Sequence, residues 1–98
     1  MLSISAGVAQ DFEVGIRAAQ AGDFDTALRE LRPLAKQGHA GAQYNLGVMY
    51  LHGKGVSQDY AAALKWYRLA AEQGHAIAQY ALGFMYDNGN GVLQDYVE

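Results

Sequence analysis

Cysteine is absent from the 98-residue sequence, and proline occurs only once. Without cysteine the chain can form no disulfide, no thiolate metal site and no cysteine nucleophile. Charged residues are also few, at 17%, and the formal net charge of −3 gives no reason to expect a nucleic acid or an anionic membrane as partner. No apolar run approaches the ~20 residues that a membrane span requires. The chain is therefore expected to be a soluble domain without a membrane span.

Glycine, alanine and tyrosine are abundant because the sequence repeats itself every 36 residues. Residues 73–96 match residues 37–60 at 17 of 24 positions, and such self-similarity is typical of a repeat architecture. A degenerate copy lies upstream, where Asp23 precedes Asp59 by the same interval. The loop that leads to Asp23 is four residues shorter than the loop that leads to Asp59. We expect a single repeat domain over 1–98, with units at about 8–39, 40–75 and 76–98, the last of them incomplete.

Each unit is predicted to fold as two helices. In the middle unit, apolar residues recur at three- and four-residue steps from Ala42 to Tyr50. Glycines then end this first helix near His52. Asp59 is well placed to cap a second helix, because its carboxylate can accept hydrogen bonds from free backbone N–H groups. That second helix should run to about Gln73.

Three further residues carry structural expectations. Gly47 has no side chain, so it should let the two helices of its unit approach closely. Gly74 suits the left-handed position after the last turn of a helix. Pro33 falls inside a predicted helix over 23–37, where it removes a backbone hydrogen bond, so we expect a kink or a local break there.

The unit from Ala40 to His75 resembles a Sel1-like repeat, a relative of the tetratricopeptide repeat. The resemblance extends over nearly the whole chain, and it implies an all-α fold: a right-handed α-solenoid of antiparallel helix pairs with about two and a half repeats. It also implies an adaptor or scaffold of protein complexes, often bacterial, with the first helices lining a concave face. The motifs that carry it are the 36-residue spacing, Leu46-Gly47, the Gly-x-Gly-Val loop at 53–56 and the Trp66-Tyr67-x-x-Ala70-Ala71 block.

With the first helices on that concave face, their side chains should form an apolar and aromatic floor with a polar rim. Such a surface suits an extended peptide or a helix from a partner protein. Tyr44 and Tyr80 recur identically, so the alternative is that both serve mainly in helix packing. Positions that differ between copies, such as Val48 against Phe84, are better candidates for specificity. The predicted ligand-binding residues are Phe12, Ile16, Tyr44, Val48, Leu51, His52, Tyr80, Phe84, Asp87 and Asn88.

The end of the sequence predicts an uncovered apolar flank. The second helix of the third unit should begin after Asp95, so residues 82–86 would lack a covering helix. Terminal repeats need a polar outer face, and an open apolar flank favours self-association. A homodimer and a fragment of a longer repeat protein are both consistent with this pattern. The flank residues are Leu82, Tyr86, Val92, Leu93, Tyr96 and Val97.

Enzymatic chemistry has little support in the sequence. No nucleophile and base recur together, and no three-ligand metal cluster is assembled, so we expect no catalytic residues, no metal and no cofactor. A hydrolase acting on a cell-wall-related substrate is a remote alternative, which a site joining His52, Ser57 and Asp87 would support. His39 and His75 are expected to lie beside the C-terminal carbonyls of the preceding helices.

The compartment is not fixed by the sequence. Residues 1–9 are apolar and small but lack the basic opening and full apolar region of a signal peptide. They are either an ordinary lead-in to a helix or the remnant of a signal peptide. The chain would be cytoplasmic in the first case and periplasmic or secreted in the second.

Overall fold

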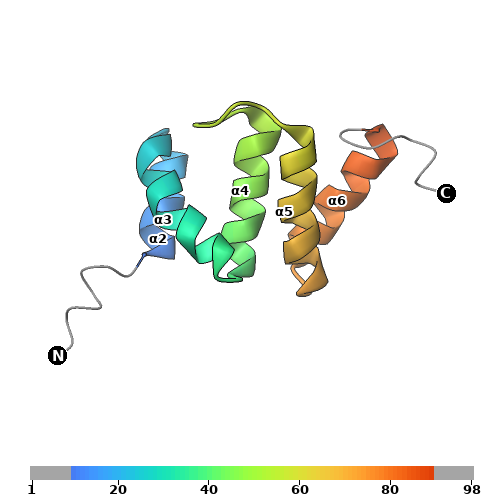
Figure 1. Cartoon of the computed structure of the whole chain (residues 1–98), viewed down its shortest axis with the longest axis horizontal. Helices are drawn as coiled ribbons and strands as arrows, with labels where there is room; N and C mark the ends of the chain where they lie inside the picture. Colours follow the sequence, from blue (N-terminus) through green and yellow to red (C-terminus); the bar gives the residue numbers. More distant parts are fainter. Residues whose placement is uncertain (1–9, 90–98) are drawn as a thin grey trace.

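The computed structural model describes residues 10–89. Within this range the chain forms α-helices and no strand, and each helix packs against the next one along the chain (Figure 1). The described part is therefore an all-α solenoid of helix pairs, which confirms the predicted fold class. The helices are α2 (Phe12–Gln20), α3 (Phe24–Lys36), α4 (Ala40–His52), α5 (Tyr60–Glu72) and α6 (Ala76–Asn88).

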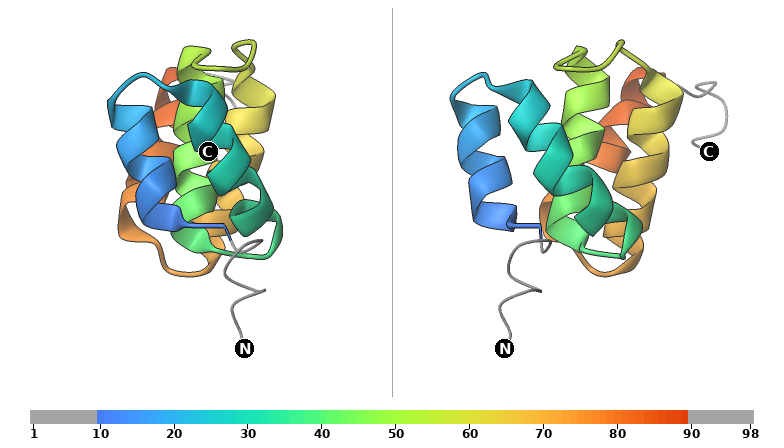
Figure 2. Two further views of the ribbon diagram at one scale, coloured as in Figure 1. Left: turned by 90° about the vertical axis from the view of Figure 1, so that its left-hand side faces the viewer. Right: turned by 60° about the vertical axis from the view of Figure 1, so that its left-hand side comes forward.

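The helices pair in chain order, α2 with α3 and α4 with α5. Figure 2 shows α2, α4 and α6 as successive first helices, with α3 and α5 as the second helices that return beside them. α6 is the first helix of a third pair. The predicted end of α4 and the predicted end of α5 agree with the structure to within one residue, whereas α4 begins at Ala40, two residues before the predicted periodic stretch.

Aspartate caps start the helices where the sequence predicts one. The carboxylate of Asp59 accepts a hydrogen bond from the backbone N–H of Ala62 at 3.0 Å, and Asp23 caps α3 in the same way. At the other end, α4 terminates at Gly53, whose φ of 68° is left-handed, and Gly74 after α5 has a φ of 87°. Both glycines occupy conformations that residues with a Cβ rarely adopt.

His39 and His75 differ from the expectation. The Nδ1 atom of His39 accepts a hydrogen bond from the N–H of Ala42 at 3.1 Å, and that of His75 accepts from Ala78 at 3.1 Å. Each ring therefore caps the N-terminus of the helix that follows it, instead of lying against the carbonyls of the preceding helix. Only an unprotonated ring nitrogen can accept a hydrogen bond, so the cap requires a neutral imidazole.

Both histidine rings also stack on an aromatic residue of the preceding first helix. His39 lies 4.5 Å from the Phe12 ring, measured between centroids, and His75 lies 5.1 Å from the Tyr44 ring. Each histidine thus combines a helix cap with a contact between successive units. The repeated Gln-Gly-His-Ala motif is explained by this double role.

Replacing His75 with alanine should lower the free energy of unfolding by about 1 kcal/mol, because the N-cap of α6 is lost. Asparagine is a good N-cap, so His75→Asn should keep the hydrogen bond and lose only the stacking on Tyr44. Urea unfolding followed by circular dichroism measures both variants. Equal losses in the two variants would show that the stacking, and not the cap, carries the effect.

α3 runs through Pro33 without the predicted local break. Helical hydrogen bonding resumes directly after it, since the N–H of Gln37 donates to the carbonyl of Pro33 at 3.1 Å. Leu31 and Ala35, on either side of the proline, are 0% and 1% exposed. Their burial holds α3 together across the missing hydrogen bond.

The core is divided between two clusters of small and medium side chains. Leu31 and Leu46 belong to the cluster between α3 and α4, and Tyr67 and Met85 belong to the cluster between α5 and α6. The two helices within a pair meet at a glycine. A Cβ at Gly47 would lie 2.6 Å from the Tyr67 ring, so the predicted close approach at Gly47 is confirmed.

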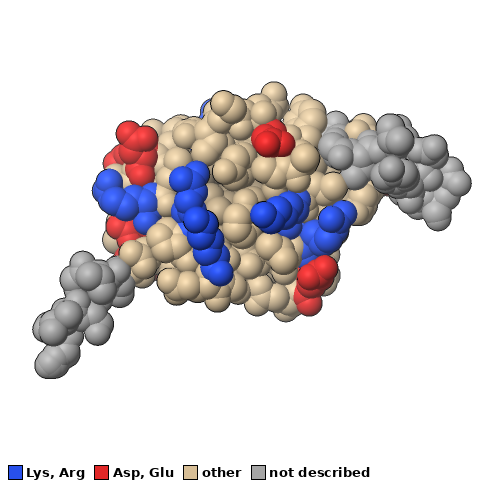
Figure 3. All heavy atoms as spheres, in the orientation of Figure 1, with Lys and Arg blue, Asp and Glu red and all other residues tan. Residues whose placement is uncertain are grey.

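Basic side chains gather on the face that α3 and α5 present (Figure 3). Acidic side chains such as Glu30 and Glu72 lie on the same two helices, so the face carries both signs of charge. Glu13 and Arg17 of α2 form an exposed ion pair at 3.2 Å. The basic residues of α3 and α5 are Arg29, Arg32, Lys36, Lys65 and Arg68.

Candidate functional site

Two hollows lie on either side of α4. One, with a volume of about 460 Å³, lies between α2 and α4 and also touches the start of α3 and Lys54. The other, with a volume of about 360 Å³, lies between α4 and α6 over the middle of α5. Val48 and His52 line both hollows. The two spaces are therefore neighbouring parts of one groove, divided by two side chains of α4.

The hollow between α4 and α6 is apolar and aromatic. Its floor contains Tyr67 and Met85, which are 2% and 1% exposed. Its edge carries Ile77, Tyr80 and Phe84, which are 59%, 75% and 55% exposed. A soluble domain rarely leaves several large apolar side chains together at the surface unless they bind something. This hollow is the stronger candidate for a binding site.

Tyr67 places a buried phenol at the floor of that hollow. Its ring stacks on Tyr44 with centroids 5.6 Å apart. Its hydroxyl makes no hydrogen bond within residues 10–89. No side-chain nitrogen or oxygen in that range is fully enclosed without a partner, so the hydroxyl must reach the surface of the hollow that Tyr67 lines.

Burial, and to a smaller extent the neighbouring Tyr44, raises the pKa of Tyr67 above the ordinary tyrosine value. Above about pH 10 the unfolded chain loses this proton while the folded chain keeps it, so stability must fall as pH rises. Each pH unit above that point costs about 1.4 kcal/mol.

Tyr67→Phe should therefore lose less stability than the wild type between pH 10 and pH 11, as measured by urea unfolding. The exposed Tyr60→Phe is the control, and an equal effect in both variants would contradict the assignment.

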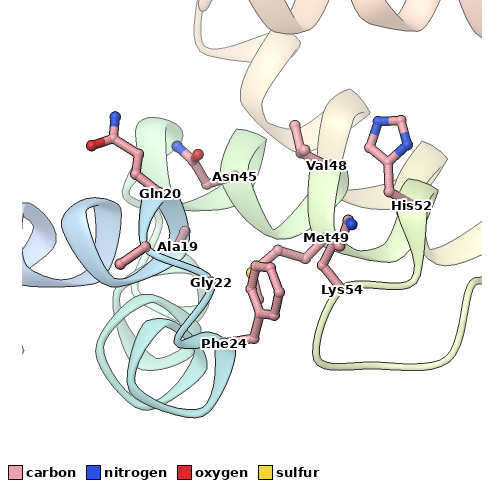
Figure 4. Close-up of a pocket in the computed structure, with 10 residues that line it drawn as sticks. Ala19, Gln20, Gly22, Phe24, Asn45, Val48, Met49, His52 and Lys54 are labelled. Carbon is pink, nitrogen blue, oxygen red and sulfur yellow. The ribbon is translucent and has the colours of Figure 1, made fainter.

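The hollow between α2 and α4 is more polar. Figure 4 shows Gln20, Val48 and His52 projecting to the same side, with Asn45 between α2 and the rest of α4. The Lys54 ammonium lies 5.9 Å from the centroid of the Phe24 ring. None of the ten residues that line this hollow is acidic. Its polar groups are therefore amides, an imidazole and a single ammonium.

The structure brings six of the ten predicted groove residues together. These six all line the hollow between α4 and α6, and Val48 and His52 also line the hollow beside it. They are Tyr44, Val48, Leu51, His52, Tyr80 and Phe84.

The four other predicted groove residues lie elsewhere. Phe12 and Ile16 pack against the core cluster, and a Cβ at Gly41 would lie 2.9 Å from the Phe12 ring. Because Gly41 lets this ring pack onto α4, Phe12 lines neither hollow. Asp87 and Asn88 lie exposed in the last turn of α6, outside both hollows.

Sequence reasoning did not assign Tyr67, Asn45 or Lys54 to the groove. Tyr67 comes from a second helix, whereas the prediction considered first helices alone. Gly47 was the available signal, since a glycine at a helix contact requires a bulky partner and that partner is Tyr67. Lys54 gave no signal through repetition, because its repeat equivalent is the uncharged Asn90.

Two of the predicted flank residues are partly covered. Leu82 and Tyr86 are half-buried against the cluster between α5 and α6. The Tyr86 hydroxyl accepts a hydrogen bond from Nη2 of Arg68 at 2.6 Å. Val92, Leu93, Tyr96 and Val97 lie outside the described residues.

Over residues 10–89, no group of three or more His, Asp or Glu side chains is placed to hold a metal ion. None of the helices described is both long and apolar enough to cross a membrane. Ser57 and Asp87 line neither of the two hollows that His52 lines. These hollows thus do not join the three residues that the hydrolase alternative requires.

Comparison with known proteins gives one family and two solved structures. A family model described as Sel1 repeat matches residues 40–75 and 76–98. The crystal structure of a Sel1 repeat protein from Oxalobacter formigenes is 40% identical with a TM-score of 0.73, over 83% of this chain and 64% of that one. A protective antigen of uropathogenic Escherichia coli strains, described as displaying an SLR fold, is 43% identical with a TM-score of 0.77, over 89% of this chain and 19% of that one. The chain thus spans less than two thirds of the length of either of these two proteins. A comparison with curated proteins gave no match.

Proposed function

The chain belongs to the Sel1 repeat family, whose members are generally protein-interaction modules and typically not enzymes. We therefore propose that it binds a protein or peptide segment in the groove along α4. The supporting observation is the hollow between α4 and α6. Its large apolar residues surround a buried floor and remain exposed themselves. Sites of this kind bind apolar side chains and exclude water from them.

Peptides selected from a random twelve-residue display library on the wild-type chain provide the test. Phe84→Ala should weaken binding of the selected peptides at least tenfold, because truncating an aromatic residue that anchors a partner costs about 2 kcal/mol or more of binding free energy. Fluorescence anisotropy measures the affinity. Phe84 is 55% exposed, so the variant should remain folded by circular dichroism.

Leu69→Ala is the matched control for this test. Leu69 is a large apolar residue, 36% exposed, on α5 and outside both hollows. Its truncation should leave peptide affinity unchanged. If no peptide is enriched, or if Phe84→Ala binds as well as the wild type, the groove assignment is wrong.

A second proposed function is self-association through the open side of α6. A Cβ at Gly15 would meet Leu31 at 2.7 Å and one at Gly47 would meet Tyr67 at 2.6 Å, but one at Gly83 meets no atom within 4 Å. Within the described residues α6 therefore has no second helix over its glycine. A second copy of the chain could cover this apolar side.

Light scattering over a range of concentrations tests this second function. The wild type should form dimers as concentration rises, and Gly83→Glu should remain monomeric because a charge would enter the apolar contact. Ala61→Glu, at an exposed position of α5, should dimerise like the wild type. A wild type that stays monomeric at the highest concentration would contradict the proposal.

A further inference from the structure

Within residues 10–89, the hollow between α2 and α4 carries hydrogen-bond donors and a positive charge but no carboxylate. The chain has 10 acidic residues against 7 basic ones, yet no acidic residue of the described part lines this hollow. Gln20, Asn45, His52 and Lys54 do line it. The two amides and the imidazole carry acceptors as well as donors, so it is the Lys54 ammonium that makes this hollow complementary to an anionic group.

The backbone holds Lys54 at the edge of this hollow. Gly53 takes the left-handed conformation that ends α4, and the N–H of Lys54 then donates to the carbonyl of Met49 at 2.9 Å. Lys54 forms no ion pair within residues 10–89, where the one ion pair found joins Arg17 and Glu13. Its ammonium is therefore available to a carboxylate from a partner.

The floor of the neighbouring hollow supplies a second, independent indication of a ligand. The side chain of Tyr67 is 98% buried, and its hydroxyl has no hydrogen-bond partner in the described part of the chain. Because this hydroxyl reaches the surface of the hollow, a ligand there can bond it in place of water. Since apolar side chains surround it, the best partner is a backbone carbonyl next to a bulky apolar side chain.

One helix separates the two hollows, which fixes the spacing of the groups they would bind. Neighbouring helices pack with axes 8–10 Å apart, so the two hollows lie about 10 Å apart across α4. An extended peptide in the polyproline II conformation advances about 3.1 Å per residue and turns every third side chain to the same face. A peptide that crosses Val48 and His52 would therefore place side chains about three residues apart into the two hollows.

From these observations we infer that the partner is an extended peptide with one large apolar side chain and an aspartate or glutamate about three residues from it. The apolar side chain enters the hollow between α4 and α6, and the carboxylate enters the hollow between α2 and α4 beside Lys54. The inference rests on the proposed function, because it specifies the partner for the same groove.

Synthetic ten-residue peptides on a Gly-Ser background test this register. One pair carries Phe-x-x-Glu and Glu-x-x-Phe, because either chain direction is allowed. Matched pairs replace Glu with Lys, or Phe with Ala. Anisotropy with the whole chain should show one Phe–Glu peptide binding at least tenfold more tightly than its Lys and Ala counterparts, and raising the salt concentration should reduce the preference for Glu over Lys.

Variants of the chain separate the two hollows. Lys54→Gln should abolish the preference for Glu over Lys and leave the preference for Phe over Ala. Phe84→Ala should do the reverse, and Tyr67→Phe should weaken all Phe-containing peptides several-fold without changing the fold. Lys65→Gln on α5 is the charge control, because Lys65 lines neither hollow, and it should bind like the wild type.

The outcomes distinguish this inference from the proposed function. Equal binding of the Glu and Lys peptides, with library peptides still sensitive to Phe84→Ala, would overturn the acidic register alone. Binding of library peptides but of none of the designed ones would do the same. If neither library nor designed peptides bind, the groove function and the inference both fail.

Discussion

Tyr67→Ala lowers the free energy of unfolding by about 3–5 kcal/mol, the usual cost of truncating a buried aromatic residue. Tyr67 is 2% exposed and belongs to the cluster that joins α5 to α6. Its ring also fills the space over Gly47 and stacks on Tyr44. The substitution therefore removes contacts with α4 and α6 together. Because small domains have only 5–15 kcal/mol of stability in total, most of the chain's margin would be lost.

The matched control is Tyr60→Ala, the same change on the same helix. Tyr60 is 40% exposed at the first position of α5, so its loss should cost less than 1 kcal/mol. Urea unfolding of the two variants gives the comparison. Similar losses at both positions would mean that Tyr67 does not hold the two units together.

Gly47→Ala and Gly83→Ala change stability in opposite directions, although the two glycines, 36 residues apart, occupy equivalent positions of the repeat. A Cβ at Gly47 would lie 2.6 Å from the Tyr67 ring, a distance that side chains do not tolerate, so Gly47→Ala should cost about 1–3 kcal/mol. A Cβ at Gly83 meets no atom of residues 10–89 within 4 Å. Alanine there should gain about 0.5–1 kcal/mol, because glycine is a poor helix former.

Urea unfolding of these two alanine variants measures a difference of about 1.5–4 kcal/mol between equivalent positions. The pair also tests the open side of α6 without any ligand. A loss of stability in Gly83→Ala similar to that in Gly47→Ala would show that something in solution covers Gly83. At concentrations where the chain is monomeric, we expect no such loss.

The helix bounds were predictable because their signals are local. Asp59 needs only its own hydrogen bond to the N–H of Ala62 to mark a helix start, and Gly53 needs only its own left-handed backbone to mark an end. The close contact at Gly47 was also predictable, because a glycine repeated within a helix has no local purpose. Repetition every 36 residues then extended each local prediction to its copy.

The histidine caps were not predictable from the same signals. His39 and His75 lie between the end of one helix and the start of the next, so sequence alone allows contacts with either end. The cap is favoured by stacking on Phe12 and Tyr44, which lie 27 and 31 residues earlier. That contact depends on how successive units are placed in space, which the repeat length does not specify.

The groove was predicted in outline and differs in detail for a related reason. Phe12 and Tyr44 were both predicted to bind the ligand. The next first helix, however, carries Gly41 beside Phe12 and the repeat equivalent Ile77 beside Tyr44. Gly41 lets the Phe12 ring pack onto α4, whereas Ile77 lines the apolar hollow with Tyr44. A single change between copies thus decides whether an aromatic residue belongs to the core or to the groove.

The stacked histidine caps have a consequence for how the units unfold. In a repeat protein, cooperativity depends on the coupling between nearest neighbours and not only on the stability of each unit. His75 supplies such a coupling, since it holds the start of α6 and contacts Tyr44 of the preceding unit at once. Whether α6 separates before the rest of the array, or melts together with it in one transition, therefore depends on the helix cap and the ring contact that His75 makes.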